Sequence, residues 1–438
     1  MSMLNDILVP VLIMWPIFLG TGLSCMFVVQ KFTKEKLQNL DKAILFGAAY
    51  LLGAALVTFF QFFLSLIKIP ILISFWGFVP IALTGFYLMA KDSKKTQKHK
   101  LSLSRIFTWV LLLAICFFFF TRSFARTMYT WDAVAFWMPK IFALWQDGVV
   151  KKETFEFFNH PEYPLLLPMT GATVYSLFSA PNEIAVKVAL FGYTLAFLLM
   201  LEGFLHKTQN LPKKLFFLFL MLSLFIFREH VAGEYVGTAD ILVGIYMFAG
   251  AALLLQKKPL LALLLWAFVP WTKSEGMVWI LSSGFLTVLF FWKSVFKKYW
   301  SFLLLPVFFV SVWSIYNKII GMSSQYFKFD EIYARPWLEY AVYSVHAFRE
   351  EFRNLQKWNL LFFFFFAATL TRIKEIFSSK ELMVLMLSLI AQVSSYILIF
   401  TITPEEQATF IAAAISRLTL HIAPTALLVT AYLFKKES

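Results

Sequence analysis

The ionisable residues of this 438-residue chain whose types suit chemistry lie near the ends of apolar segments. The acids that share this placement are Asp132, Glu162, Glu234, Asp240 and Glu275. The cations and imidazoles are Arg126, Lys140, Lys273, Arg417, His160, His230 and His421. Ionisable groups at membrane depth are costly, so they usually mark a pathway or a binding site. Carboxylates could take a proton from a hydroxyl group while cations hold a phosphate, which suits a charged, lipid-linked substrate.

Each of these candidates also has a purely structural interpretation. Asp132 could be the N-cap of a helix, and Glu162 could be a solvated loop carboxylate. Lys273 and Glu275 could form an interfacial ion pair that serves topology. Arg417 could be a snorkelling residue at the start of a helix. The residue types leave both interpretations open.

Metal and nucleotide motifs are absent from the sequence. The spacing His160-x-Glu162 is found in zinc deaminases, but their Pro-Cys-x-x-Cys partner is missing. Cys25 and Cys116 both lie inside apolar runs and read as small core residues. No phosphate-binding glycine loop, zincin helix or Gly-x-Ser-x-Gly elbow occurs. We therefore expect no cofactor, and a divalent cation beside a substrate phosphate stays an open alternative.

The elements that must position these residues are membrane helices. The chain is 60% hydrophobic and 15% charged, which excludes a soluble domain of this size. The pattern predicts an all-α, polytopic membrane protein of about 13 transmembrane helices. The predicted spans are 7–30, 43–67, 69–90, 105–121, 183–205, 214–228, 238–256, 259–272, 277–292, 300–318, 358–371, 382–402 and 418–434. Because 259–272 and 277–292 are short for a core of about 30 Å, they are either tilted or form a hairpin that stops below the outer surface.

The net charge of +14 is concentrated in short loops between the predicted spans. These loops contain 23 of the 39 Lys and Arg residues: 31–42, 91–105, 207–214, 257–258, 293–298, 372–380 and 435–436. Such an asymmetry indicates a cytoplasmic side and not a nucleic-acid partner. It predicts a cell-membrane protein with its N-terminus outside and its C-terminus in the cytoplasm. The long segments 122–182 and 318–357 are then extracytoplasmic.

The first of these outer segments should carry amphipathic surface helices. After Trp131 and Asp132, a helix is predicted over 133–147, and Gly148 would end it. The apolar stretch 165–179 cannot be a full span, because the basic loop at 207–214 would then lie on the wrong side. We interpret it as a second surface or re-entrant helix.

These motifs, taken in order, resemble the C-type membrane glycosyltransferases, which include the protein O-mannosyltransferase and aminoarabinose-transferase relatives. The motifs are Trp131-Asp132 after a span, a helix with Lys140, His160-Pro-Glu-Tyr-Pro164, Gly233 to Asp240, Lys273-Ser-Glu-Gly276, and Ser416-Arg417 to His421 and Pro424. The resemblance covers about 105–438 as a glycosyltransferase-like membrane core. Residues 1–104 form N-terminal transmembrane helices outside that core.

The resemblance implies transfer of a sugar from a polyprenyl-phosphate carrier to an acceptor at the extracytoplasmic face. The family's essential acid corresponds by position to Asp132, which we expect to act as the base. Many members have paired acids there, so Glu162 as a second catalytic acid is an inference from its place in the loop. The expected donor-phosphate and substrate-binding residues are Lys140, His160, Tyr163, Asp240, Lys273, Glu275, Arg417 and His421.

The acceptor is unspecified and could be a protein, a lipid or a polysaccharide of the cell envelope. Two other classes of function compete with a glycosyltransferase. A secondary transporter or lipid flippase would show repeats and charges near the membrane midplane, and the sequence contains no repeat. A non-enzymatic envelope scaffold would tolerate replacement of the outer acids.

Overall fold

The computed structural model describes residues 3–33, 35–93, 102–156, 158–322, 336–403 and 406–435. These residues form α-helices with short π and 3-10 segments and contain no strand, so the predicted all-α class is confirmed. Parts of the predicted loops 91–105 and 318–357, and the last residues of the C-terminal tail, lie outside the described residues.

Nine helices in the described parts are long and apolar enough to cross a membrane, which makes the chain a multi-pass membrane protein. They are Met3–Thr33, Lys42–Leu66, Ile71–Asp92, Leu103–Phe124, Glu183–Thr208, Gly276–Phe296, Trp300–Ile320, Lys380–Ile402 and Gln407–Leu433. The helices Leu211–Ser223 and Phe225–Ala232, bent by 67°, could form a tenth span. Shorter apolar helices are Leu166–Phe178, Asp240–Leu255, Pro259–Thr272 and Leu361–Thr371. The predicted spans overlap these elements, the last one starting eleven residues too late, and the count of thirteen crossings stays a prediction.

The chain divides into two compact units, the first made of 1–218 and 228–239 and the second of 219–227 and 240–438. Neither boundary falls at residue 105, where the family-like core is predicted to begin. The boundary at residue 105 marks the start of the resemblance to a family, and a division into compact units does not test it.

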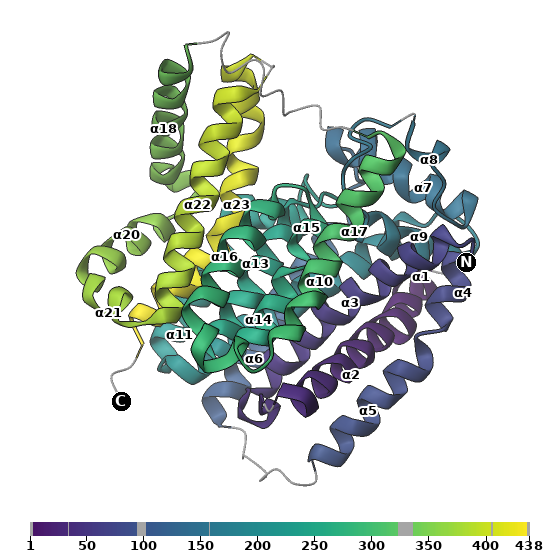
Figure 1. Ribbon diagram of the computed structural model, residues 1–438, viewed down its shortest axis with the longest axis horizontal. Helices are drawn as coiled ribbons and strands as arrows, with labels where there is room; N and C mark the ends of the chain where they lie inside the picture. Colours follow the sequence, from purple (N-terminus) through teal and green to yellow (C-terminus); the bar gives the residue numbers. More distant parts are fainter. Residues whose placement is uncertain are drawn as a thin grey trace. The chain divides into compact units, whose positions relative to one another are not determined.

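The first unit contains α1 to α10, the start of α11 and the end of α12 (Figure 1). Its elements are α1 (Met3–Val9), η1 (Pro10–Met14), α2 (Trp15–Thr33), η2 (Leu37–Asn39), α3 (Lys42–Leu66), α4 (Ile71–Trp76), α5 (Val79–Ser93), α6 (Leu103–Phe124), η3 (Ala133–Trp137), α7 (Met138–Asp147), α8 (Glu153–Glu156), α9 (Leu166–Phe178), α10 (Glu183–Thr208), α11 (Leu211–Ser223) and α12 (Phe225–Ala232).

Small residues let the first helices of this unit approach closely. A Cβ at Gly22 would lie 1.7 Å from the Ala49 carbonyl oxygen, and one at Gly53 would lie 1.7 Å from that of Phe18. Backbone contact of this kind between α2 and α3 is typical of membrane helices, where van der Waals packing replaces the hydrophobic effect. Helix α2 also packs against α5, and α3 against α10, so the N-terminal helices are integral to the first unit.

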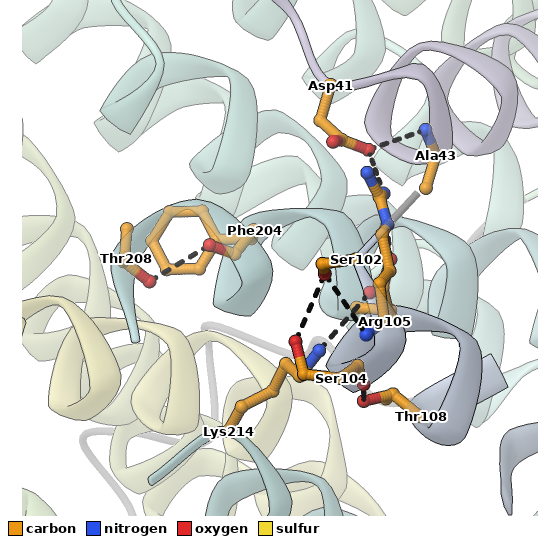
Figure 2. A network of polar contacts seen from close by, with 10 residues as sticks. Asp41, Ala43, Ser102, Ser104, Arg105, Thr108, Phe204, Thr208 and Lys214 are labelled. Carbon is orange, nitrogen blue, oxygen red and sulfur yellow. Dashed lines mark hydrogen bonds and ion pairs between the residues drawn. The ribbon is translucent and has the colours of Figure 1, made fainter. Parts of the chain in front are cut away.

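A buried ionic network joins four helix ends of the first unit (Figure 2). Asp41 caps α3 by accepting from the Ala43 N–H, and its carboxylate also accepts from Arg105 Nη2 at 2.6 Å. Glu202 on α10 lies between Arg105, at 3.1 Å, and the Lys214 Nζ atom of α11, at 3.6 Å. Glu202 and Lys214 are 0% and 2% exposed. Two of the cations that mark the predicted cytoplasmic side therefore serve as internal ion-pair partners.

The second unit contains the C-terminal helices, with the ends of α11 and α12 that the first unit lacks. Its other elements are α13 (Asp240–Leu255), α14 (Pro259–Trp266), α15 (Val269–Thr272), α16 (Gly276–Phe291), η4 (Trp292–Phe296), η5 (Trp300–Leu303), α17 (Leu304–Ile320), α18 (Trp337–Arg353), α19 (Leu355–Trp358), α20 (Leu361–Thr371), α21 (Ile373–Ser378), α22 (Lys380–Ile402) and α23 (Gln407–Leu433).

Two helices of this unit, α22 and α23, provide most of the framework for the polar cluster described below. Helix α13 packs against α14 and α23, and α16 packs against α22. Helix α18 lies beside α22 and α23 (Figure 1), and Phe348, Phe400 and Leu418 belong to the apolar core between them. Glu406 caps α23 by accepting from the Ala408 and Thr409 N–H groups.

Candidate functional site

The segment 122–182, which the sequence predicts to be extracytoplasmic, contains Asp132 and the helix that follows it. Gly148, with φ +67°, ends α7 as expected, because its N–H reaches the Leu144 carbonyl in a left-handed conformation. The N-cap interpretation of Asp132 is wrong. The helical backbone already includes Trp131, Asp132 has helical angles, and its side chain makes no capping hydrogen bond. The partly exposed carboxylate is therefore not committed to the helix start.

Lys140 on α7 is the most deeply buried charge of this segment, at 0% exposure. Its Nζ atom donates to the His160 carbonyl oxygen at 2.5 Å. It also lies 5.9 Å and 5.8 Å from the ring centroids of Trp137 and Tyr163, within the range of cation–π attraction. Burial lowers the pKa of Lys140 to about 7, although the nearby Glu162 carboxylate acts in the opposite direction.

The turn at His160 brings three of the predicted site residues together. His160 has φ +52°, and its carbonyl accepts from the Tyr163 N–H at 3.1 Å. The His160 ring stacks on Tyr163, and its Nδ1 atom lies 3.5 Å from Glu162 Oε1. Glu162 is 6% exposed, so its interpretation as a solvated loop carboxylate is wrong. The predicted residues Lys140, His160, Glu162 and Tyr163 thus form one buried group.

Two contacts that the sequence did not predict attach another motif to this predicted outer segment. Arg122, at the end of α6, pairs with Glu229 of α12 at 2.9 Å. Gly237, with φ +93°, lies so close to Met128 that a Cβ there would be 2.6 Å from the sulfur. The turn that leads to Asp240 therefore packs against the segment that leads to Asp132. The glycines of the motif were the available signal, because positive φ and close approach both favour glycine.

The second unit holds a separate cluster at helix breaks. Asp240, the first residue of α13, accepts from Lys273 Nζ at 2.8 Å and lies 3.3 Å from His421 Nε2. Lys273 follows the end of α15, and Glu275 precedes α16. Lys273 Nζ lies 3.1 Å from Glu275 Oε1, and Arg417 is near enough to act electrostatically on Asp240. All five residues were predicted as substrate-binding residues.

Two residues of α22 complete this cluster and were missed by the sequence reasoning. The Tyr396 hydroxyl makes a hydrogen bond of 2.7 Å with His421 Nδ1. Gln392 Nε2 donates to the Glu275 carbonyl oxygen at 3.0 Å. Gln392 and Tyr396 are polar residues four apart in an apolar helix, so they share one face. That spacing was a usable signal.

Three buried acceptor atoms of the cluster have no hydrogen-bond partner within the described residues. They are Asp240 Oδ2, Glu275 Oε2 and Gln392 Oε1. Buried polar atoms are usually satisfied, since an unpaired one costs about 1–3 kcal/mol. The cluster can therefore accept hydrogen bonds from a ligand that carries hydroxyl groups.

The position of Arg417 differs from the prediction. We expected it at the start of the last span, but α23 begins at Gln407, ten residues earlier. At about 1.5 Å per residue, Arg417 lies about 15 Å along the helix. The interpretation as a snorkelling residue at a helix start is therefore wrong, because the helix starts about three turns earlier.

The described residues contain no group of three His, Cys, Asp or Glu side chains that could hold a metal ion. Compared with known proteins, the chain matches no family model, no curated protein and no solved structure. The resemblance to the C-type glycosyltransferases therefore rests on the motifs of the chain itself.

Proposed function

We propose that this protein transfers a sugar from a polyprenyl-phosphate donor to an acceptor at the extracytoplasmic face of the membrane. The observation that supports this most is the cluster of the second unit. Asp240, Lys273 and His421 come from three motifs of the resemblance that are far apart in the sequence, yet their side chains are in contact. Contact among them is what a shared substrate site would require.

The composition of the cluster suits the proposed donor. Its unpaired carboxylate and amide oxygens can accept from sugar hydroxyls. The Arg417 guanidinium matches the geometry of a phosphate, and Lys273 adds a second positive charge nearby. Because the cluster lies among membrane helices, the polyprenyl chain would stay in an apolar environment while its head group is bound.

The proposed reaction needs a base and a stabilised leaving group. The acceptor hydroxyl oxygen attacks the anomeric carbon, and the bond from that carbon to the phosphate oxygen breaks. The hydroxyl proton passes to the Asp132 carboxylate, and the departing polyprenyl phosphate takes the negative charge. Arg417 would stabilise that charge, and Glu162 would position the acceptor or the sugar. No general acid is demanded, because the phosphate is already a good leaving group.

The direct test uses the purified full-length chain in detergent, where no ion gradient exists. A panel of radiolabelled polyprenyl-phosphate monosaccharides is incubated with envelope extract from cells that lack the protein. We expect one donor to label a protein, lipid or polysaccharide and to release polyprenyl phosphate. Absence of transfer from every donor of the panel, with folded protein, would contradict the proposal.

One observation favours a second candidate, a transporter or flippase. Arg417 and His421 lie well inside α23, and the helix pair α14 and α15 is short and broken. Discontinuous helices and charges within the membrane are typical of secondary transporters. Proteoliposomes separate the two functions. A transporter would move a labelled solute or lipid-linked sugar across the bilayer without breaking the sugar–phosphate bond.

A further inference from the structure

The buried ammonium group of Lys140 does not fit the role that its motif suggests. The resemblance assigns it to the donor phosphate, but the side chain is 0% exposed. Its Nζ atom instead donates to the His160 carbonyl at 2.5 Å and lies 5.9 Å and 5.8 Å from the ring centroids of Trp137 and Tyr163. A phosphate could reach this nitrogen only if the turn at His160 moved away.

The backbone of the turn at His160 has an unfavourable conformation that surrounding contacts must stabilise. A non-glycine residue with positive φ is disfavoured, and His160 has φ +52°. Its carbonyl oxygen accepts two hydrogen bonds, one from the Tyr163 N–H at 3.1 Å and one from Lys140. The first closes the turn within the segment. The second attaches the turn to α7. Helix α7 also packs against α9, which follows the turn in the chain.

We propose that Lys140 is a positioning residue that fastens the turn 160–163 to α7 and thereby fixes the Glu162 carboxylate. This proposal rests on the proposed function in one respect, that Glu162 acts on the acceptor or the sugar. Lys140 itself touches neither substrate. The Glu162 carboxylate, which lies on the turn that Lys140 holds, favours the charged form of the lysine.

The attachment should depend on pH. The groups that face the ammonium are Glu162, His160 and Tyr163 on the turn, and Trp137 on the preceding helical segment. Burial disfavours the charged form of the amine, so protonation of Lys140 favours an open turn in which the amine is solvated. Because burial lowers the pKa of Lys140 to about 7, the attachment strengthens as the pH rises through neutrality.

Amide hydrogen exchange of the full-length protein tests the attachment without any assay of activity. The variant Lys140→Met keeps the length of the side chain and removes the donor. Lys152→Met, at an exposed lysine of the same segment, is the matched control. We expect the Tyr163 amide to exchange at least tenfold faster in Lys140→Met and at the wild-type rate in the control. Unchanged exchange in Lys140→Met would overturn the proposal.

Kinetics distinguish the proposal from a phosphate ligand. With a competent donor, we expect Lys140→Met to lower kcat and leave the donor KM unchanged. A donor KM raised tenfold with normal exchange would overturn the attachment and restore the phosphate role. If no donor is used by the wild type, the proposed function fails while the exchange comparison still decides on Lys140.

A measurement on the wild type covers the case in which the variant does not fold. After correction for intrinsic chemistry, exchange of the Tyr163 amide should slow between pH 6 and pH 8, because loss of the proton from buried Lys140 favours the closed turn. A rate that does not change with pH over this range would contradict the attachment.

Discussion

Two buried charged groups in this protein have similar composition and different surroundings. The network of Asp41, Arg105, Glu202 and Lys214 joins helix ends of the first unit (Figure 2). The cluster of Asp240, Lys273, Glu275, Arg417 and His421 lies at helix breaks and inside a long helix of the second unit. Each combines two carboxylates with two cations, and the second adds an imidazole.

The difference lies in what the carboxylates do. In the first network Asp41 also caps α3, and each of the four residues links one helix end to another. In the second, both acids keep one oxygen with no hydrogen-bond partner within the described residues. Glu202 Oε1 of the first network also has no hydrogen bond, but it lies 3.6 Å from Lys214 Nζ in an ion pair. Ion pairs that fasten helices can be replaced by apolar packing, whereas those that bind a substrate cannot. Charge at membrane depth is therefore not by itself evidence of a site.

The predicted topology can be tested by thiol labelling, which gives a yes-or-no result for each position. In a background without Cys25 and Cys116, Glu153→Cys should react with an impermeant thiol reagent from outside. Lys213→Cys, beside the first network, should react after permeabilisation. Both positions are exposed. The reverse labelling pattern would place the proposed site on the cytoplasmic side and contradict the account.

Replacement of an ion pair by apolar residues separates the two groups most sharply. The double variant Asp240→Leu with Lys273→Met removes both charges of a buried pair, so folding should be largely retained. Sugar transfer per mole of folded protein should fall by about 10²-fold or more, because the charges that bind the transition state are gone. Transfer at the wild-type rate would show that this cluster is structural as well.

Substitutions in the first network should lower the stability of the protein and leave its turnover unchanged. Glu202→Gln leaves the buried Lys214 without its partner, which typically costs about 3–5 kcal/mol. Thermal unfolding in detergent should show this loss, and the double variant Glu202→Met with Lys214→Met should recover much of it. Transfer per folded molecule should stay at the wild-type level in both. A selective loss of turnover would mean that this network also contributes to function.

The pH dependence of Lys140 provides the smallest effect. Its pKa is about 7 in the folded protein and has its ordinary value of 10.5 after unfolding. Between these values the unfolded chain binds the proton and the folded chain does not, so stability rises with pH. The stability of the wild type relative to Lys140→Met should rise by up to about 1.4 kcal/mol per pH unit above pH 7. If the stabilities of the wild type and Lys140→Met changed with pH in parallel, the lowered pKa of Lys140 in the folded protein would be contradicted.

The sequence predicted those features of the fold that depend on local composition. Apolar runs located the helices, and Gly148 marked the end of α7 because a left-handed residue is needed there. The start of α23 was missed, because Arg417 was taken as the boundary of the last span. The residues before it are also apolar, at 408–415, and they belong to the same helix.

The candidate site was predicted as a set of residues and not as an arrangement. The motifs identified Asp240, Lys273 and His421, since ionisable groups stand out in apolar surroundings. They could not show that Lys140 is turned towards the His160 carbonyl, because that contact joins residues 20 positions apart through a left-handed turn. Tertiary contacts such as that of Tyr396 with His421 were equally beyond reach of local patterns.

The central claim is that an acid of the outer segment of the first unit catalyses transfer from a lipid-linked donor, and Asp132→Asn tests it most directly. Asn preserves the size of the side chain, and Asp132 makes no capping hydrogen bond, so stability should change little. Loss of a general base typically costs about 10²–10⁴-fold, so transfer per mole of folded protein should fall by that order. Glu153→Gln, an exposed acid of the same segment, should transfer at the wild-type rate. Near-normal turnover in Asp132→Asn would contradict the account and move the search for the base to Glu162.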